Sequence, residues 1–314
     1  MANSSDSDAK VQYLTVDENA EGQRIDNFLM ARLKGVPKSW VYRVLRKGEV
    51  RVNKGRAKPT RKLEIGDEVR VPPVRRSDDK ALTPGSGMQQ AITDNILYED
   101  DLLLIVNKPS GMAVHGGSGV SHGVIEALRA ARPEAKFLEL AHRLDRDTSG
   151  CLMLAKKRSS LKELQKLQVT NQVDKRYQAL LDGRWRKGKQ TVDVPLQKNT
   201  LKSGERMVRV DPEGKKAITH FTVLQHFSSS TLVEAKLETG RTHQIRVHAQ
   251  YAGTPIVGDN KYETPEALAY WNEQGAKRLF LHAWRLSFPW EGKRFQIEAP
   301  LPAELQSVLE GIAE

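Results

Sequence analysis

The spacing of hydrophobic residues in the first quarter of the chain predicts two helices. From about Gln23, apolar residues recur at intervals of three and four, which predicts one buried stripe made of Ile25, Phe28, Leu29 and Leu33. The sequence Gly35-Val36-Pro37 would end this helix. A second helix is expected over residues 38–47, with Val41, Val44 and Leu45 facing inward and Gly48 ending it.

Short alternating segments follow the second helix and predict small strands. Their apolar positions are Val50 and Val52, then Leu63 and Ile65, then Val69 and Val71. The sequence Asn53-Lys54-Gly55 between the first two segments is typical of a hairpin turn. Further on, the apolar run from Leu102 to Val106 suits a strand buried on both faces.

Stretches of low periodicity divide the chain into parts. We expect residues 1–20 to be a flexible polar N-terminus and residues 77–93, rich in Gly, Ser, Pro and Gln, to be a linker. The predicted organisation is therefore a small domain over 21–76 and a larger one over 94–314, which contains strands and helices in irregular order without a repeat.

Composition places the chain among soluble globular proteins. It has 314 residues, of which 39% are hydrophobic and 28% are charged. No run approaches the roughly 18 apolar residues of a membrane-spanning helix. The N-terminus lacks the apolar core of a signal peptide, and the single cysteine, Cys151, excludes an intrachain disulfide. We therefore expect a cytoplasmic protein that does not contact a membrane.

Positive charge is concentrated in the small domain. The net charge is +11, and residues 34–76 hold 14 Lys or Arg against four Asp or Glu. Such a local excess favours a polyanion as partner, with nucleic acid as the first choice. The alternative is a patch that only keeps the protein soluble, a task that interspersed charges of both signs would perform equally well.

The most informative segment is His142-Arg143-Leu144-Asp145-Arg146-Asp147-Thr148-Ser149-Gly150. It sets two acids, two arginines and a histidine between largely apolar stretches. Burying such a turn costs free energy unless its charges are paired with each other or take part in catalysis. One interpretation is a salt-bridged turn capped by Thr148 and Ser149, and the other is a catalytic loop.

This segment resembles the signature His-Arg-Leu-Asp-x-x-Thr-Ser-Gly of the RluA-type pseudouridine synthases, and every specified position matches. The resemblance implies that Asp145 is the catalytic nucleophile and that Arg143 holds the flipped-out state of the nucleotide. Asp147 falls at a variable position of the signature. The implied fold is α+β, a catalytic domain with a mixed, mainly antiparallel sheet.

Other segments of that family follow in order. Residues 106–115, from Val106 to His115, resemble its first motif, and residues 175–180 resemble the motif that supplies an active-site tyrosine, here Tyr177. Residues 239–248 resemble the third motif, in which the matching arginine, Arg246, pairs with the catalytic carboxylate. Residues 278–283 match a segment expected to line the pocket with apolar side chains. A metal site at His243 and His248 is disfavoured, because residues five apart do not share a helical face.

The small domain resembles the S4 RNA-binding domain through Arg24-Ile25-Asp26, through the segment from Ser39 to Asn53, and through Leu63-x-x-Gly66-Asp67. The resemblance implies that its second helix presents a basic face to RNA, formed by Lys38, Arg43, Arg46 and Lys47. Such contacts position RNA without reading its sequence. With both domains considered, the chain is most similar to the RluC branch, enzymes of 23S ribosomal RNA with an attached S4 domain.

The implied reaction needs no cofactor and no metal. It breaks the bond from ribose C1′ to N1 of uracil, rotates the base and rejoins it through C5. Asp145 would either attack C1′ or abstract a ribose proton. We expect a monomer that acts on 23S ribosomal RNA or on a large-subunit assembly intermediate. Two rivals remain: an RNA-binding protein without activity, and a glycosylase that would release free uracil.

Overall fold

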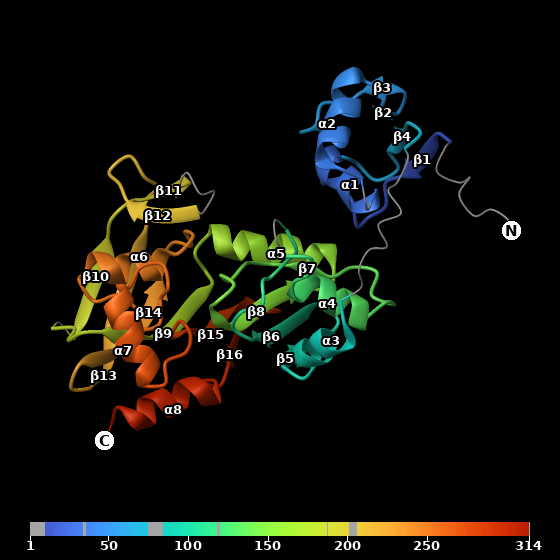
Figure 1. The fold of residues 1–314 in the computed structure, drawn as a ribbon. Coiled ribbons are helices and arrows are strands. Elements are labelled where there is room, and N and C mark those ends of the chain that lie inside the picture. Colours follow the sequence, from blue (N-terminus) through green and yellow to red (C-terminus); the bar gives the residue numbers. More distant parts are fainter. Residues whose placement is uncertain are drawn as a thin grey trace, which may run out of the picture. The chain divides into compact units, whose positions relative to one another are not determined.

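The chain forms two compact units, which are each described separately (Figure 1). A computed structural model describes residues 10–33, 36–74, 84–117, 120–186, 188–200 and 206–313. Unit 1 extends to Thr83 and unit 2 begins at Pro84. Each unit has its own buried hydrophobic core. Among the described residues, no helix has the length and apolarity needed to cross a bilayer.

Unit 1 packs two helices against a small antiparallel sheet, whose strand order is β1-β4-β2-β3. Its elements are β1 (Gln12–Thr15), α1 (Ile25–Arg32), α2 (Lys38–Lys47), β2 (Arg51–Val52), β3 (Gly55–Arg56) and β4 (Glu68–Val71). Both predicted helices are confirmed, and their predicted apolar faces are buried. The predicted hairpin turn is also present. Asn53 and Lys54 both have positive φ between β2 and β3, as a two-residue turn of this kind requires.

Two expectations for unit 1 are wrong. Residues 10–20 are not a frayed end, because β1 pairs along its whole length with β4 and Val16 and Ala20 are buried. Residues 1–9 lie outside the described residues. Leu63 and Ile65 do not form a strand. The backbone of Leu63 instead bonds to Gly22 and Gln23, the segment that leads into α1, and Ile65 is exposed.

Unit 2 is built on one large sheet. Its helices are α3 (Ser86–Thr93), α4 (Val124–Ala131), α5 (Arg158–Val169), α6 (Gln244–Tyr251), α7 (Pro265–Glu273) and α8 (Ala303–Gly311). Its strands are β5 (Ile96–Glu99), β6 (Leu103–Lys108), β7 (Glu139–Leu140), β8 (Ser149–Ala155), β9 (Asp174–Asp182), β10 (Lys189–Asp193), β11 (Leu196–Thr200), β12 (Arg206–Val210), β13 (Ile218–His226), β14 (Ser230–Leu237), β15 (Leu281–Trp290) and β16 (Lys293–Glu298).

The large sheet is mixed and mainly antiparallel, as predicted. Its strand order is β10-β13-β14-β9-β15-β8-β6-β5, with β16 beside β15 and β7 beside β8, while β11 and β12 form a separate hairpin. The short pairing of β8 with β15 is parallel and the others are antiparallel. At this pairing Gly150 has φ +110°, and a Cβ there would overlap the backbone of Ala283. Only glycine therefore allows β8 to start this close to β15.

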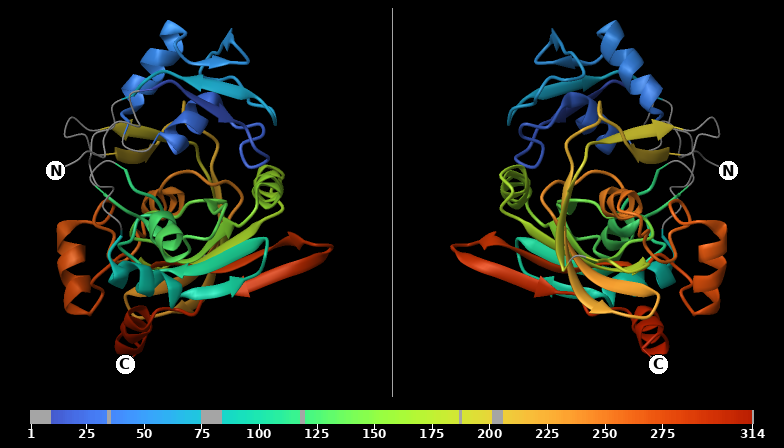
Figure 2. Two further views of the ribbon diagram at one scale, coloured as in Figure 1. Left: turned by 90° about the vertical axis from the view of Figure 1, so that its right-hand side faces the viewer. Right: turned by 90° about the vertical axis from the view of Figure 1, so that its left-hand side faces the viewer.

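Hydrophobic side chains cover both faces of the sheet. On β6, Leu104 and Val106 belong to the core under α3, α4 and α8, whereas Leu103 and Ile105 belong to the core under α5. The helices α5 and α8 accordingly lie on opposite sides of the strands (Figures 1 and 2). The predicted buried strand over residues 102–106 is thus confirmed, and its continuous apolar run reflects burial on two faces.

The predicted linker and domain start are displaced. Residues 86–93 form α3, which packs against α4, and Ile92 is fully buried. Unit 2 therefore begins ahead of the expected residue 94. The sequence signal was weak because α3 buries only this one residue and contains Ser86 and Gly87, which are poor helix formers. Residues 77–83 of the expected linker lie outside the described residues.

Candidate active site

A cavity of about 380 Å³ in unit 2 brings together the catalytic candidates of the sequence. Asp145 comes from the loop between β7 and β8, Tyr177 from β9 and Arg246 from the first turn of α6. Arg143 also lines this cavity and is exposed. The other predicted RNA contacts, Lys38, Arg43, Arg46 and Lys47, lie elsewhere, on the exposed side of α2 in unit 1.

The loop that carries Asp145 is held by neighbouring segments. The fully buried Lys108, at the end of β6, donates hydrogen bonds from Nζ to the carbonyl oxygens of Pro109, Met112 and Arg146 at 2.8, 2.8 and 2.9 Å. Ser110 Oγ donates to the carbonyl of Asp147 at 2.7 Å. Burial lowers the pKa of Lys108 to about 7. The first motif thus anchors the loop at residues 146 and 147, just beyond Asp145.

Asp145 faces two side chains from the third motif. Its Oδ2 lies 4.0 Å from Nη1 of Arg246 and 3.9 Å from Nε2 of His243. The Asp145 side chain remains 21% exposed, whereas that of Arg246 is 2% exposed. A carboxylate that is open to the cavity therefore stands against a cation that is enclosed by protein.

The tight partner of Arg246 is Asp259, which the sequence analysis missed. Nε and Nη2 of Arg246 donate to the two carboxylate oxygens of Asp259 at 2.7 and 2.5 Å, and Asp259 is fully buried. Burial alone would lower the pKa of Arg246, but the hydrogen bonds and charge of Asp259, with the charge of Asp145, raise it overall. This two-pronged pair fixes the guanidinium plane and leaves Nη1 directed toward Asp145.

His243 and Tyr262 complete the surroundings of Arg246. The guanidinium lies over the Tyr262 ring, 5.1 Å from its centroid, and Tyr262 Oη lies 2.8 Å from Nδ1 of His243. Tyr262 Oη also accepts a hydrogen bond from the amide of Val208 at 3.0 Å. Burial is the main reason that the pKa of His243 is lowered. The imidazole is therefore a neutral polar neighbour of Asp145 at neutral pH.

A buried glutamine shapes the third motif. Gln244 Oε1 accepts from Thr239 Oγ1 and the amide of Arg241, and its Nε2 donates to Ile218 O and Thr219 Oγ1. His243 precedes it with φ +54°, a left-handed conformation that reverses the chain before α6 begins. These contacts tie the loop 239–241 to the helix that carries Arg246.

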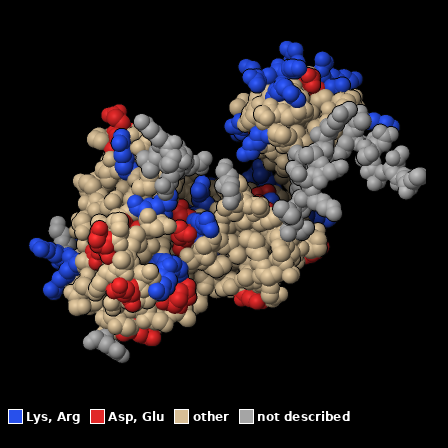
Figure 3. Space-filling model, viewed as in Figure 1, with Lys and Arg blue, Asp and Glu red and all other residues tan. Residues whose placement is uncertain are grey.

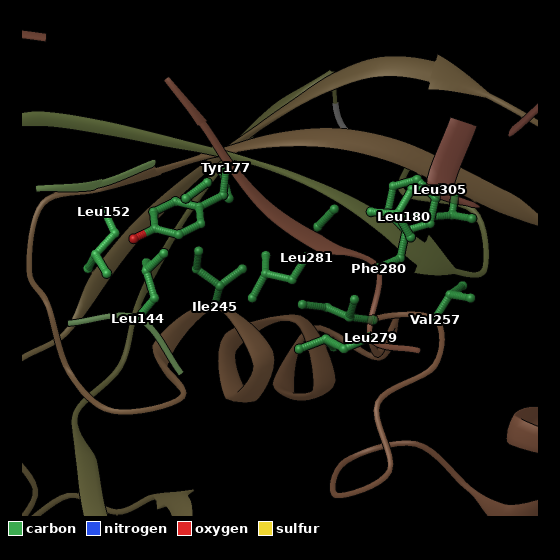
Figure 4. Packing of buried hydrophobic residues seen from close by; sticks show 14 of the residues in the cluster. Leu144, Leu152, Tyr177, Leu180, Ile245, Val257, Leu279, Phe280, Leu281 and Leu305 are labelled. Atoms are coloured by element: carbon green, nitrogen blue, oxygen red, sulfur yellow. The ribbon is translucent and has the colours of Figure 1, made fainter. Parts of the chain in front are cut away.

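Tyr177 forms the apolar wall of the cavity. Figure 4 shows its ring near Leu144, Leu152, Ile245 and Leu281, which belong to the same core cluster. Burial raises the pKa of Tyr177 well above its ordinary value, and the negative charge of Asp145 adds to this effect. The phenol is therefore protonated at neutral pH. Of the segment 278–283, Leu281 lines this cavity, as expected for an apolar lining residue.

The salt-bridged-turn interpretation of residues 142–147 finds no support. Among the described residues, no ion pair joins charged side chains within this segment, and Asp145 faces Arg246 and His243 instead.

His142 Nε2 accepts from the amide of Met153 at 3.1 Å, and burial lowers its pKa to about 3. His248 is directed elsewhere, with Thr219 Oγ1 at 2.9 Å from its Nδ1.

Comparison with known proteins agrees with this geometry. The family model for RNA pseudouridylate synthase matches residues 102–251, and that for the S4 domain matches residues 23–69. Proteins named ribosomal large subunit pseudouridine synthase C are 51% identical in Haemophilus influenzae (98% of this chain, 96% of the relative) and 54% identical in Escherichia coli K12 (96% of each chain).

Solved structures show the same relationship. Human RNA pseudouridylate synthase domain containing 4 is 29% identical with a TM-score of 0.61, covering 72% of this chain and 95% of that one. Human RNA pseudouridylate synthase domain containing 1 is 26% identical with a TM-score of 0.58, covering 70% and 86%. The fold and the motifs thus define an RNA-modifying isomerase. The chain belongs to the RNA pseudouridylate synthase family, with an S4 domain in unit 1.

Asp259→Asn should destabilise unit 2 markedly, because it leaves the buried guanidinium of Arg246 without its anionic partner. Removing one member of a buried pair costs up to roughly 3–5 kcal/mol. Thermal melts would measure this loss. The matched control is Glu304→Gln, which removes the exposed partner of Arg278 and should cost about 0–1 kcal/mol. Equal losses in the two variants would contradict the importance of the buried pair.

Proposed function

We propose that this enzyme converts uridines of large-subunit ribosomal RNA into pseudouridine, with Asp145 as its nucleophile. The observation that carries the proposal is the convergence of Asp145, Tyr177 and Arg246 on one cavity of unit 2. The names of the bacterial relatives, which match nearly the whole chain, support ribosomal RNA of the large subunit as the substrate. Such a substrate implies action in the cytoplasm.

Asp145 is suited to act at ribose C1′. Its carboxylate reaches the cavity, while Arg246 attracts it from the buried side at 4.0 Å. Because Asp259 already binds Nε and Nη2 of the guanidinium, Nη1 is the nitrogen directed toward Asp145, and Arg246 orients this carboxylate without enclosing it. Rotation and rejoining of the base consume and release no other group, so we expect neither cofactor nor metal. One chain supplies these residues, and we expect a monomer.

Tyr177 would hold the base and assist the final proton loss from C5. Its ring offers an apolar surface on which uracil can pack. Its raised pKa means that the hydroxyl would act as a neutral hydrogen-bonding group rather than as a preformed phenolate. The enclosed wall of the cavity would also exclude water from the detached base, which separates this reaction from that of a glycosylase.

Arg143 and unit 1 would act on the RNA around the target. A uridine has to leave its stack to reach the cavity, and this costs a few kcal/mol. The exposed Arg143, two residues before Asp145, can fill the space that the base leaves. In unit 1, Lys and Arg side chains gather along the upper edge of the face visible in Figure 3. The basic side of α2 would contact phosphates and raise affinity without selecting a sequence.

Asp145→Asn should abolish pseudouridine formation, because an amide cannot serve as the charged nucleophile, while the folded state and RNA binding should persist. Asp147→Asn is the matched control. Asp147 lines a different cavity from Asp145, and it should keep substantial activity. Pseudouridine content after nuclease digestion, measured beside a thermal melt, tests both variants. An active, folded Asp145→Asn enzyme would overturn the proposed mechanism. If Asp147→Asn is the inactive variant instead, the nucleophile is misassigned.

Tyr177→Phe should slow the single-turnover rate by about 100-fold or more, the range expected when a group that assists proton transfer is lost. RNA affinity should change little, because the ring that packs on the base remains. The rate has to be measured with enzyme in excess over RNA, so that binding does not limit it. A rate equal to that of the wild type would restrict Tyr177 to packing.

Replacing Lys38, Arg43, Arg46 and Lys47 together by Gln should weaken RNA binding without reducing the single-turnover rate at saturation. Each lost phosphate contact should lower the slope of log affinity against log salt by about 0.7–0.9. The dissociation constant at several salt concentrations gives this slope. A slope equal to that of the wild type would exclude the basic side of α2 as an RNA contact.

A further inference from the structure

The active-site cavity borders a second, larger cavity of about 830 Å³ in the same unit. Two acidic residues line this second cavity, and each is paired with a neighbouring side chain. Asp174 lies 3.2 Å from Arg176, and Glu238 lies 3.1 Å from His220. Basic Lys236 and Arg294 also line this second cavity. Six residues line both cavities and mark their common border: Gln168, Val169, Lys175, Leu237, Gly240 and Arg241.

Lys175 stands at this border, two residues before Tyr177 on β9. Residues i and i+2 of a strand share a face, so both side chains reach the active-site cavity. The neighbouring Arg176 points to the opposite face, where it pairs with Glu234. Of the two cations of β9, Lys175 is thus the one that faces the active-site cavity.

The ammonium of Lys175 lacks an anionic partner. Its Nζ donates to the neutral Oε1 of Gln168 at 2.9 Å, and among the described residues no carboxylate oxygen lies within 4.0 Å of it. Two other partly buried cations differ in this respect: Lys156, just after β8, lies 2.9 Å from Glu99, and Arg285 on β15 lies 3.8 Å from Glu234. Burial lowers the pKa of Lys175 to about 8. An unpaired charge in such a place is costly unless a ligand supplies the counterion.

The border also offers an apolar contact. Val169, at the end of α5, is 84% exposed and lines both cavities. Proteins that bind single-stranded nucleic acid combine cations that contact phosphates with surfaces on which bases pack. Lys175 can supply the first contact, and Val169 offers a small apolar surface for the second. The RNA chain must pass this border if it enters one cavity and continues into the other.

We propose that Lys175 binds the phosphodiester adjoining the flipped uridine and that the second cavity holds the neighbouring nucleotide. The enzyme would therefore recognise its target within an unpaired segment of at least two nucleotides. This inference rests on the proposed function, since it takes the flipped uridine in the active-site cavity as its starting point.

Neutralising single phosphates tests this contact directly. The RNA is a large-subunit fragment in which the wild-type enzyme forms pseudouridine. One linkage beside the target carries a methylphosphonate, and a matched 2′-O-methyl RNA that keeps the charge is the reference. For the wild type, neutralising the contacted linkage should weaken binding on the order of tenfold. For Lys175→Met the same change should cost nothing further.

Lys293→Met is the matched control, since Lys293 is exposed on β16 and lines neither cavity. It should respond to the methylphosphonate as the wild type does. Lys175→Gln serves as a second variant if a melt shows that Lys175→Met is unfolded. The proposal is overturned if the wild type tolerates neutralisation of both linkages beside the target, or if a folded Lys175 variant suffers the full penalty. A wild-type enzyme that forms no pseudouridine in ribosomal RNA would instead refute the proposed function.

Discussion

The buried ion pair between Arg246 and Asp259 is the constraint on which the site depends. Both side chains are almost completely enclosed, so neither charge can be left without the other. Asp259 also accepts a hydrogen bond from the amide of Lys261 within its own loop, and its pair with Arg246 ties this loop to the start of α6. The orientation of Arg246 toward Asp145 thus follows from an interaction that lies behind the cavity.

A second buried cation, Lys108, holds the loop that carries Asp145. Lys108 lies at the end of β6 and donates to carbonyl groups of the loop after β6 and of the loop before β8. Arg146, one residue beyond Asp145, adds a bond from Nε to the carbonyl of Gly111 at 2.9 Å. These contacts from neighbouring segments hold the loop at residues 146 and 147. The side chain of Asp145 is therefore not needed to hold the loop and stays free for substrate.

The sequence predicted the residues that meet in the cavity, and it missed those that hold them. Asp145, Tyr177 and Arg246 lie within motifs that resemble a family, and the structure brings them together. Asp259 follows an apolar stretch and a glycine, Gly258, at which an added Cβ would overlap the carbonyl of Arg278. That Gly-Asp sequence was the only local sign of Asp259. Its partner, Arg246, lies in another element, and pairing between two elements leaves no periodicity in the sequence.

Periodicity also explains the outcome for the elements. The helices α1 and α2 were predicted because their buried faces repeat at helical spacing. The strand β1 escaped because it is a polar edge strand whose residues are only exposed or half-buried. The sequence likewise could not predict that Lys175 lacks an anionic partner, because this depends on which residues the fold brings next to it.

The central claim is that the cavity isomerises uridine and does not remove its base. RNA of the large ribosomal subunit, labelled with tritium at C5 of uridine, tests this most directly. Because C5 must lose its hydrogen when the base is rejoined through that carbon, the wild-type enzyme should release tritium into water in an amount equal to the pseudouridine formed. No free uracil should appear. Retention of all tritium, or release of uracil with abasic RNA, would contradict the account.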